Sequence, residues 1–425
     1  MRKIHRTASK LEPKQCAVVN ASFEGQIEMN RYIGRRAWLG RLGVVAAVVM
    51  LGASLGGCRK SGGGGEETIK IGAYFSLSGS DSTFGLDSKE GVELALEEQN
   101  AKGGVKGKKV RVLFEDNKSN PQEASNKVRQ LIDRDKVVAV LGEVASSRSL
   151  AGGLIANTKK VPMVTPSSTA IEVTQGREYV FRACFTDDMQ GALGAEFATK
   201  TLGKSKVAIL FVAQDAYSSG LADAFRKSVT KLGATIVADK GYQKGETNFT
   251  TYLSELKAAG PELIYVPVYY TDMVGIARQA KALDLPGSMF LGGDGWDSED
   301  LLRGAASELE GAYFTNHYAP DVPWPGSQAF VTAYRAKFDR EPSSLAAQAY
   351  DAAKLLFDAI ERSTEPTPQA IRDALAATRG FQGATGTISM DENRNAQKPL
   401  VVVQVRDGKF AYHSTVGETV ESASK

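Results

Sequence analysis

The chain has 425 residues, which is enough for two or three domains, and its 42% hydrophobic and 24% charged residues are typical of a globular protein. The formal net charge is +3 and long clusters of Lys and Arg are missing, so neither nucleic acid nor an anionic surface is an expected partner. There are 3 cysteines, Cys16, Cys58 and Cys184, and the first two lie in the N-terminal region ahead of the folded part, so at most Cys184 belongs to that part and no internal disulfide framework is possible.

The N-terminal region has the pattern of an export signal. Residues 31–41 carry four arginines and no acid, and residues 42–55 form an apolar run that is too short to span a bilayer comfortably. The run ends in Leu55-Gly56-Gly57-Cys58, which resembles a bacterial lipobox, where cleavage precedes a cysteine that carries a diacylglycerol. An ordinary signal peptide with an incidental cysteine is the alternative.

A short glycine-rich segment follows this motif. Four consecutive glycines, Gly62 to Gly65, predict a flexible linker between a membrane anchor and a folded body. We therefore expect residues 1–57 to be an N-terminal extension with a lipoprotein signal peptide. Residues 58–66 are expected to be the linker that begins at lipidated Cys58.

Strands and helices alternate from residue 68 onward. The run at 137–141 is apolar throughout, as in a strand buried on both faces of a parallel sheet. Asn120 and Pro121 open a helix, and Ala124 and Val128 follow at helical spacing. The first array is predicted to contain strands at 68–74, 110–114, 137–141 and around Met163, and helices at 85–102, from Asn120, and from about Ser147.

The alternation then begins again, which predicts a second βαβ array and hence an α/β protein with two doubly wound, Rossmann-like lobes. Its expected helices are at 191–202, 219–232, 249–259 and 273–283, with strands at 207–212, 235–237, 263–266 and 289–291. Helices at 328–338, 345–362 and 367–377 come next, followed by strands at 386–390 and 400–405. These helices are too many to extend the second lobe, so we expect the chain to return to the first lobe and to cross again near its end.

Hydroxyl-bearing residues collect directly after the strands of the first array. Ligands of open α/β sheets bind outside the carboxyl ends of the strands. Backbone N–H groups at helix N-termini, together with hydroxyls, suit an anionic group such as a carboxylate. The segments are residues 76–85, Ser146-Ser147, and Thr165-Pro166-Ser167-Ser168-Thr169-Ala170.

The second array offers aromatic residues and one carboxylate at the equivalent places. Such groups suit a cation and an apolar body, so a zwitterion with an aliphatic tail would satisfy both arrays. The residues that follow its strands are Tyr217, Tyr269 and Tyr270, and the run Gly293-Asp294-Gly295-Trp296.

Each of these residues also has a purely structural explanation. Ser147 and Thr169 could be helix N-caps, and Asp294 between two glycines could shape a turn. Tyr217 and Tyr270 could be packing residues. Their convergence at strand ends is what favours a binding site.

From about Ile69 to the C-terminus, the chain resembles the periplasmic leucine/isoleucine/valine-binding proteins, the type I solute receptors of ABC importers. No single motif is specific, but their order and spacing are. The residues that carry the resemblance are Ser78-Gly79, Phe84-Gly85, the run Asn100 to Val105, Glu115-Asp116, Ser146-Ser147, Pro166 to Ala170, Tyr217, Tyr269-Tyr270 and Gly293 to Trp296.

The resemblance implies roles for individual residues. Ser147 and Thr169 would hold a ligand carboxylate, and Ser167 and Asp294 would hold its ammonium group. The family often has Tyr at the position of Phe84 and Glu at the position of Asp294. The full set of predicted ligand-binding residues is Phe84, Ser146, Ser147, Ser167, Ser168, Thr169, Tyr217, Tyr269, Tyr270, Asp294 and Trp296.

The resemblance also implies a three-strand hinge, with crossovers near Cys184, His317 and Met390. Residues 67–184 and 319–389 would form the first lobe, and residues 185–318 and 390–425 the second. The expected partners are a small amino acid, branched-chain or similar, and the permease subunits of an ABC importer. We expect a monomer that is attached to the membrane only by its lipid and needs no cofactor or metal.

Two other functions were weighed. An envelope hydrolase has little support, because His317 and His413 lack metal-ligand spacing and the only nucleophile-elbow match, Gly52 to Gly56, lies in the signal peptide. A receptor for an amide or small organic acid that feeds a signalling system would have the same fold and pocket. The sequence therefore predicts a binding protein rather than an enzyme, with transport ahead of sensing.

Overall fold

The structure is a computed structural model that describes residues 68–417. The described residues group as one compact unit. The predicted signal peptide, the predicted linker and Cys58 lie outside the described residues. Within the described part, none of the helices combines the length and the apolar character needed to cross a bilayer.

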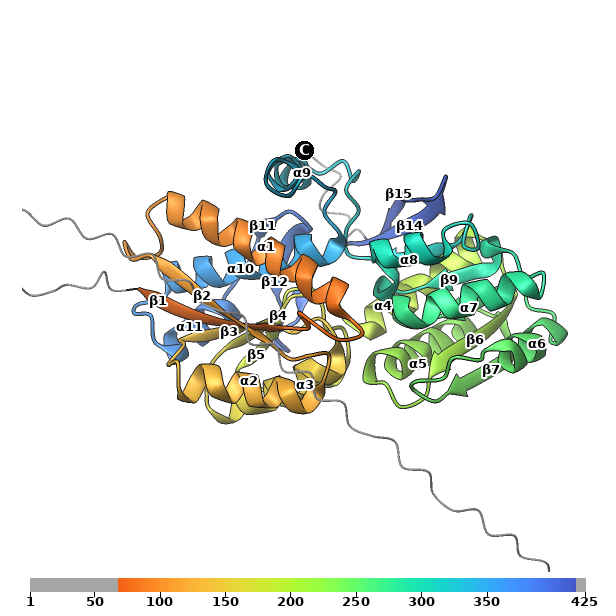
Figure 1. The fold of residues 1–425 in the computed structure, drawn as a ribbon, viewed down its shortest axis with the longest axis horizontal. Helices are drawn as coiled ribbons and strands as arrows, with labels where there is room; N and C mark the ends of the chain where they lie inside the picture. The colour runs from red at the N-terminus through yellow and green to blue at the C-terminus, as the bar shows by residue number, and fades with distance from the viewer. Residues whose placement is uncertain (1–67, 418–425) are drawn as a thin grey trace, which may run out of the picture. The chain divides into compact units, whose positions relative to one another are not determined.

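The first lobe is built on a parallel sheet of five strands in the order β2-β1-β3-β4-β5 (Figure 1). The strand order reverses between β1 and β3, as in a doubly wound fold. Its strands are β1 (Ile69–Phe75), β2 (Val110–Asp116), β3 (Ala139–Leu141), β4 (Met163–Thr165) and β5 (Val180–Arg182). The accompanying helices are α1 (Ser82–Ala101), α2 (Pro121–Asp133), α3 (Ser146–Thr158), α10 (Ser344–Arg362) and α11 (Pro368–Ala376), with a 3-10 turn η1 (Ile171–Val173).

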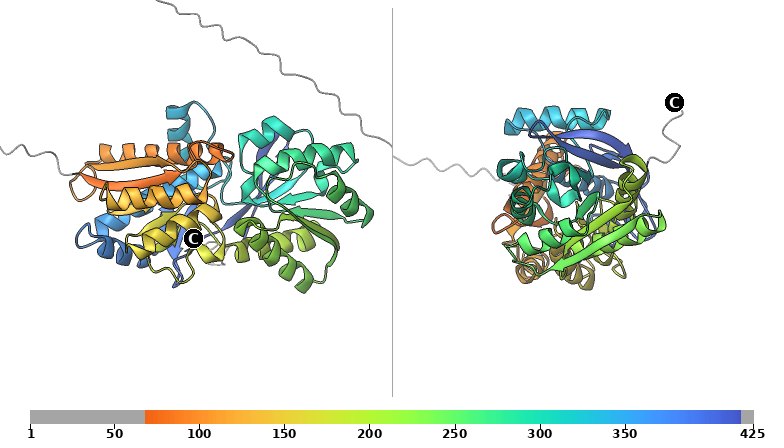
Figure 2. Two further views of the ribbon diagram at one scale, coloured as in Figure 1. Left: turned by 60° about the horizontal axis from the view of Figure 1, so that its bottom comes forward. Right: turned by 90° about the vertical axis from the view of Figure 1, so that its right-hand side faces the viewer.

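The second lobe repeats this arrangement with β7-β6-β8-β9-β10, and two antiparallel strands extend the sheet beyond β10. Figure 2 shows helices on both faces of each sheet. The strands are β6 (Lys206–Val212), β7 (Thr235–Tyr242), β8 (Leu263–Val266), β9 (Phe290–Gly292), β10 (Tyr313–Asn316), β14 (Leu400–Arg406) and β15 (Lys409–Val416). The helical elements are α4 (Asp187–Glu196), η2 (Phe197–Thr201), α5 (Ala216–Lys231), α6 (Thr250–Ala258), α7 (Tyr270–Ala282), η3 (Gly287–Met289), η4 (Asp294–Trp296) and α8 (Glu299–Ala305).

The chain passes between the two sheets at three places: from β5 to α4, from β10 to α9 (Pro325–Phe338), and from β13 (Ala396–Gln397) to β14. A small sheet of β11 (Phe381–Gly383), β12 (Gly386–Met390) and β13 lies just before the last passage. The prediction of two doubly wound lobes is confirmed. The residue boundaries proposed for the lobes stay a prediction.

Local sequence accounts well for the strongest elements. The Asn120 side chain accepts hydrogen bonds from the backbone N–H groups of Gln122 and Glu123, and Pro121 occupies the first helical position of α2. The inner face of α2 is buried, including Val128 and Leu131, because these residues recur at helical spacing. The central strands β1 and β6 are apolar and largely buried on both faces, as parallel strands require.

The weakly patterned elements differ from expectation. Helix α4 begins at Asp187 rather than at 191, because Thr186 caps it by accepting a hydrogen bond from the Met189 N–H group. Strand β7 continues to Tyr242, beyond the expected residue 237. It is an edge strand with exposed positions, so it lacks the apolar run that marks a central strand. The elements β5, β10, β15 and α8 were not expected, because each is short or has polar residues along it.

Candidate functional site

The candidate site lies where the carboxyl ends of the strands of both sheets face each other. The strand order reverses between β1 and β3 in the first lobe and between β6 and β8 in the second. Loops that leave such a reversal point diverge to opposite faces of the sheet and leave a crevice where ligands bind. Except for Leu345 at the start of α10, the residues that line the site follow β1, β3 and β4 in the first lobe and β6, β8 and β9 in the second.

The cavity between these loops is almost closed. Its volume is about 10 Å³, which is room for about one water molecule. An amino acid can therefore enter only if the lobes move apart. The lining residues are Phe84, Val144, Ser146, Ser167, Thr169, Tyr217, Tyr269, Asp294, Gly295 and Leu345.

The first lobe contributes hydroxyl groups and the start of a helix. The hydroxyls of Ser167 and Thr169 are buried and have no hydrogen-bond partner among the described residues. Ser146, the first residue of α3, accepts a hydrogen bond from the Ala170 N–H group at 3.2 Å. The first turn of a helix has backbone N–H groups that the helix itself does not use. This wall can therefore donate several hydrogen bonds to an anionic group.

The second lobe contributes a carboxylate that its own neighbours hold in place. One oxygen of Asp294 accepts hydrogen bonds from Gln190 Nε2 at 3.0 Å and from the Tyr217 hydroxyl at 2.9 Å. The other oxygen lies 3.2 Å from His317 Nε2. A carboxylate has about four acceptor sites, so Asp294 keeps capacity for one further donor such as an ammonium group.

His317 is neutral at pH 7. Burial lowers the pKa of its imidazole to about 4, although hydrogen bonding to Asp294 opposes the shift. Because a carboxylate can only accept, Nε2 of the neutral ring carries the proton and donates it to Asp294. The ring also stacks on Phe185 with 3.7 Å between centroids. His317 is thus a fixed neutral donor that orients Asp294 without cancelling its charge.

Apolar and aromatic groups form the remaining wall. The rings of Tyr217 and Tyr269 stack with 4.8 Å between centroids, and Phe84 meets Tyr269 edge to face at 5.8 Å. Val144 and Leu345 complete this side of the cavity. The wall suits an aliphatic side chain of small size.

Contacts at the rim join the lobes outside the cavity. The Tyr270 hydroxyl donates to the carbonyl oxygen of Ser80 at 3.1 Å, and its ring meets Phe84 at 4.9 Å. The Thr83 hydroxyl donates to the Asp300 carboxylate. These bonds link the start of α1 to the starts of α7 and α8, so they exist only while the lobes are together.

Seven of the predicted ligand-binding residues line the cavity: Phe84, Ser146, Ser167, Thr169, Tyr217, Tyr269 and Asp294. The other four lie elsewhere. Tyr270 is at the rim, and Ser147 is half-buried on α3 and does not line the cavity. The Ser168 hydroxyl bonds to the carbonyl oxygens of Glu143 and Val144, and Trp296 is fully buried with its indole N–H on the Val266 carbonyl oxygen at 3.0 Å.

The structure also tests the purely structural explanations that the sequence allowed for Ser147 and Asp294. Ala145 is the N-cap of α3, so Ser147 is not a cap. Asp294 begins η4 and accepts hydrogen bonds from residues of two other segments, so it does more than shape a turn. The ligand-binding roles of these residues stay predictions.

Several functional candidates were missed by the sequence analysis. Asp187 is buried next to Thr169, whose carbonyl oxygen accepts from the Asp187 N–H group. Burial, with the charge of Asp294 adding to it, raises the pKa of Asp187 well above the ordinary value. Gln190, one helical turn further on α4, orients Asp294. The only local signal was the Asp-Asp pair at the start of a helix, which is common for capping reasons alone.

Arg148 was missed as well. Its guanidinium is buried between Asp81, at 2.6 Å from Nη1, and Glu143, at 3.0 Å from Nε. Glu143 in turn accepts from the Ser76 hydroxyl and the Asn117 amide. This network fixes the loops after β1 and β3, which carry the first wall of the cavity.

The described residues contain no arrangement of His, Cys, Asp and Glu suited to a metal ion. The buried thiol of Cys184 is inert, since burial raises its pKa to about 12. The geometry is that of a closable cavity with opposite polar walls.

Comparison with known proteins agrees with this geometry. Residues 68–409 match the sequence model of the periplasmic binding protein family. The chain belongs to this family. It is 30% identical over 328 residues to the leucine-, isoleucine-, valine-, threonine- and alanine-binding protein of Pseudomonas aeruginosa, which covers 77% of this chain and 86% of that protein.

Solved structures of the family superpose closely. A leucine-binding protein of Thermotoga maritima has a TM-score of 0.78 and 39% identity, over 82% of this chain and 99% of that chain. A branched-chain amino acid transporter substrate-binding protein of Streptococcus pneumoniae, solved in complex with isoleucine, has a TM-score of 0.77 and 33% identity over the same shares, 82% and 99%.

Family membership confirms the type I periplasmic binding protein fold and a binding rather than an enzymatic function. It also indicates that this periplasmic binding protein is exported.

Proposed function

We propose that this periplasmic binding protein captures a small aliphatic L-amino acid, branched-chain or similar, between its lobes and delivers it to an ABC importer. The opposite polarity of the two walls carries the proposal. Unpaired hydroxyls and a helix start in the first lobe suit the ligand carboxylate, while Asp294 in the second lobe suits the ammonium group.

The apolar wall supports an aliphatic side chain. Val144 and Leu345 are aliphatic, and Phe84 brings a ring without a hydroxyl. Two similar solved structures point the same way, since one contains isoleucine and another, from Desulfitobacterium hafniense and 25% identical, contains leucine. The proposed ligand contacts in the first lobe are Ser146, Ser167 and Thr169, and Ser146 replaces Ser147 because only Ser146 lines the cavity.

Calorimetric titration of residues 63–425, which include the compact unit of described residues, tests the ligand class. The panel contains leucine, isoleucine, valine, threonine and alanine, with isobutyramide and benzoate as an uncharged and a purely anionic comparison. We expect aliphatic amino acids to bind most tightly. If none of them binds while the amide or benzoate does, the proposal fails and the second polar wall has another purpose.

We also propose that the protein is a lipid-anchored monomer. The motif Leu55 to Cys58 and the glycine-rich linker support the anchor. Mass spectrometry of the membrane fraction should find a diacylglycerol on Cys58, and Cys58→Ser should release the protein from that fraction. A variant that stays with the membranes would rule the anchor out.

A further inference from the structure

Arg182 is a buried cation directly behind the first wall of the candidate site. It is the last residue of β5, its side chain is fully buried, and it does not line the cavity. Its guanidinium donates to the carbonyl oxygens of Ser168 at 2.9 Å and of Ala170 at 2.8 Å. These two residues flank Thr169, which lines the cavity. Arg182 therefore holds this part of the wall from behind.

The guanidinium of Arg182 has only neutral partners. Its Nε donates to Asn395 Oδ1 at 2.7 Å, and its Nη2 also donates to the Ile171 carbonyl oxygen at 3.2 Å and the Thr174 hydroxyl at 3.0 Å. Arg182 forms no ion pair within the part of the chain that the structure describes. An unpaired buried charge is costly, so it is unusual at a position that serves the fold alone.

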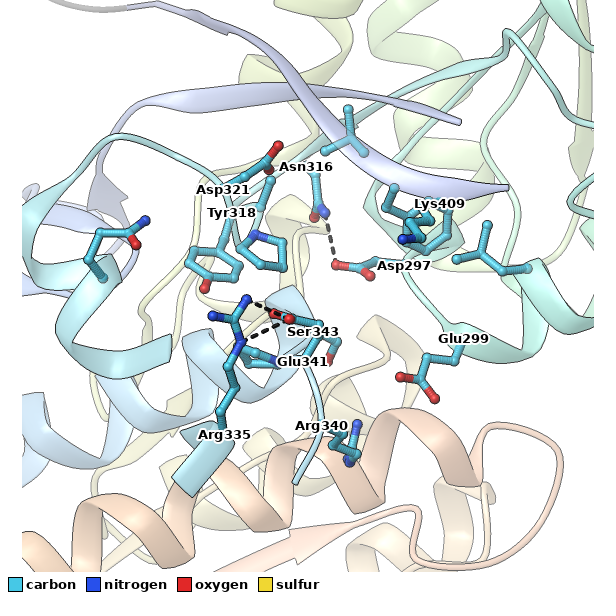
Figure 3. Close-up of a pocket in the computed structure, with 17 residues that line it drawn as sticks. Asp297, Glu299, Asn316, Tyr318, Asp321, Arg335, Arg340, Glu341, Ser343 and Lys409 are labelled. Atoms are coloured by element: carbon cyan, nitrogen blue, oxygen red, sulfur yellow. Dashed lines mark hydrogen bonds and ion pairs between the residues drawn. The ribbon is translucent and has the colours of Figure 1, made fainter. Parts of the chain in front are cut away.

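Comparable arginines are paired with carboxylates. Arg148 is as buried as Arg182, and its Nε lies 3.0 Å from Glu143. In a larger cavity of about 690 Å³, beside the passage from β10 to α9, Arg335 points toward Glu341 with 2.8 Å from Nε to Oε1 (Figure 3). Arg182 differs from both because its charge is not matched by an ion pair.

The acidic groups nearest to Arg182 do little to cancel its charge. They are Cys184, Asp187, Asp391 and Glu172. Burial raises the pKa of the Cys184 thiol to about 12 and the pKa of Asp187 well above its ordinary value, so it favours the neutral forms of both. Glu172 is exposed and Asp391 is half-buried, so water screens their charges. A net positive charge therefore remains behind the wall.

The backbone N–H group of Thr169 points away from Arg182. The Ser168–Thr169 peptide bond is trans, so this N–H is directed opposite to the Ser168 carbonyl group that the guanidinium holds. Neither the N–H nor the hydroxyl of Thr169 has a protein partner among the described residues. The Thr169 carbonyl oxygen accepts from the Asp187 N–H group, and the Ala170 N–H group donates to Ser146. Since buried N–H groups are rarely left unpaired, this fixed donor suits a ligand acceptor.

We propose that Arg182 is the positioning residue that makes the first wall selective for a carboxylate. It orients the donors of Thr169 by holding the carbonyl groups on either side, and its unpaired charge attracts an anion across one peptide unit. Water is excluded from both places, so the attraction is weakly screened. The role rests on the proposed function, because it requires a ligand whose carboxylate meets this wall.

Replacing the ligand carboxylate by an amide tests the effect of the charge. Residues 63–425 of wild type and of Arg182→Gln are titrated by calorimetry with leucine and leucinamide, at a pH where both ligands carry the ammonium group. The Gln amide can still donate to a carbonyl oxygen but has no charge. We expect the ratio of the leucinamide Kd to the leucine Kd to fall at least about tenfold in Arg182→Gln. General damage to the site would weaken both ligands by a similar factor and leave the ratio unchanged.

Asn395→Asp separates the charge of Arg182 from its hydrogen bonds, and it decides the question if Arg182→Gln does not fold. The Asp side chain is isosteric with Asn and places a carboxylate at Nε, where Asn395 Oδ1 is now 2.7 Å away. It pairs with the guanidinium while the bonds to the Ser168 and Ala170 carbonyl oxygens remain. The ratio of the two Kd values should fall at least about threefold.

Two further variants serve as rescue and control. Arg182→Lys keeps a positive charge behind the wall and should retain most of the preference for leucine, even if both ligands bind more weakly. Arg394→Gln is the matched control, because Arg394 donates to the Thr174 carbonyl oxygen but not to residues 168–171. Its Kd ratio should equal that of wild type.

The proposal is overturned by an unchanged Kd ratio in Arg182→Gln or in Asn395→Asp, or by a wild-type protein that binds leucinamide as tightly as leucine. If no amino acid binds to wild type, the proposed function fails. Titration of the same variants with benzoate and benzamide then decides whether Arg182 favours a carboxylate. If no carboxylate of any kind binds, both proposals are wrong.

Discussion

Asp294 is the side chain on which the charge of the second wall depends. Three donors from α4, α5 and the end of β10 hold its carboxylate in one orientation, and it is 6% exposed. A carboxylate fixed in this way loses little entropy when it meets an ammonium group, and the pairing is strong because both charges leave water.

Asp294→Asn should weaken binding of the best amino acid by at least about tenfold, since a charge-assisted bond is worth roughly 1.5–3 kcal/mol and about 1.4 kcal/mol is one decade in affinity. Calorimetric titration measures the change. Asp272→Asn is the control, because Asp272 binds the Tyr242 hydroxyl away from the cavity. If Asp294→Asn binds the amino acid as tightly as wild type does, Asp294 has only a structural role.

Ser146 and Ser147 form a matched pair on α3. Only Ser146 lines the cavity, because successive helical residues point about 100° apart. Ser146→Ala should weaken the amino acid about fivefold, in line with about 1 kcal/mol for one neutral hydrogen bond, and Ser147→Ala should bind as wild type does. The opposite order in the same titration would show that the ligand carboxylate contacts Ser147.

His317 should make the stability of the fold depend on pH. Its pKa is about 4 in the folded protein and about 6.5 when the chain is unfolded, so the unfolded chain binds the proton first as pH falls. The stabilisation is complete above pH 6.5 and is lost as pH falls toward 4, by roughly 3 kcal/mol.

The measurement is the free energy of unfolding from pH 7 to pH 4 for wild type and His317→Gln. The Gln amide can still donate to Asp294 but does not titrate. The difference in stability between wild type and variant should therefore shift against wild type on acidification. Parallel curves would mean that His317 does not titrate differently in the two states.

Helices of the two lobes are joined by hydrogen bonds between residues at or near their first turns. The N-terminal ends of α1 and α3 belong to one lobe, and those of α7 and α8 to the other. Tyr270 and Asp300 on α7 and α8 bond to the segment at the start of α1. These contacts do not touch the cavity, so they stabilise the closed arrangement without recognising the ligand.

Tyr270→Phe removes the hydroxyl that reaches Ser80 and keeps the ring beside Phe84. We expect ligand dissociation to become about two- to tenfold faster, because one hydrogen bond of about 0.5–1.5 kcal/mol no longer holds the lobes together. Stopped-flow fluorescence measures the rate. Tyr252→Phe, a half-buried ring in the same lobe, is the control. An unchanged rate would show that the rim bond does not contribute to closure.

For the whole molecule, the nearly closed cavity requires motion. A volume of about 10 Å³ admits no amino acid, so binding must begin from an arrangement with the lobes further apart. The connections between the lobes are short segments after β5, β10 and β13, which is where a hinge can absorb the change in backbone angles.

Small-angle scattering should show a smaller radius of gyration when a saturating amino acid is added to residues 63–425. The ligand contacts groups of both lobes only when they are together, so it shifts the population toward the closed form. Saturation is confirmed by calorimetry on the same sample. An unchanged radius at saturation would argue that the free protein is already closed and opens only transiently.

The sequence by itself determined the two βαβ arrays, most strongly patterned elements such as α2 and β6, and the places where polar residues gather. These follow from local spacing, since a helix buried on one face has apolar residues at helical spacing and a strand buried on both faces has a continuous apolar run. It also determined the chemistry of each wall, because hydroxyls follow the strands of one array and aromatics with Asp294 follow those of the other.

Only the tertiary structure decided which of these residues share a cavity. Gln190 and His317 belong to other elements than Asp294, and nothing in the local sequence marks them as its partners, yet packing brings both into contact with it. Ser168 and Trp296 have the right chemistry but turn toward the protein interior. Local pattern sets side-chain chemistry and period, whereas the direction of each side chain depends on packing between distant segments.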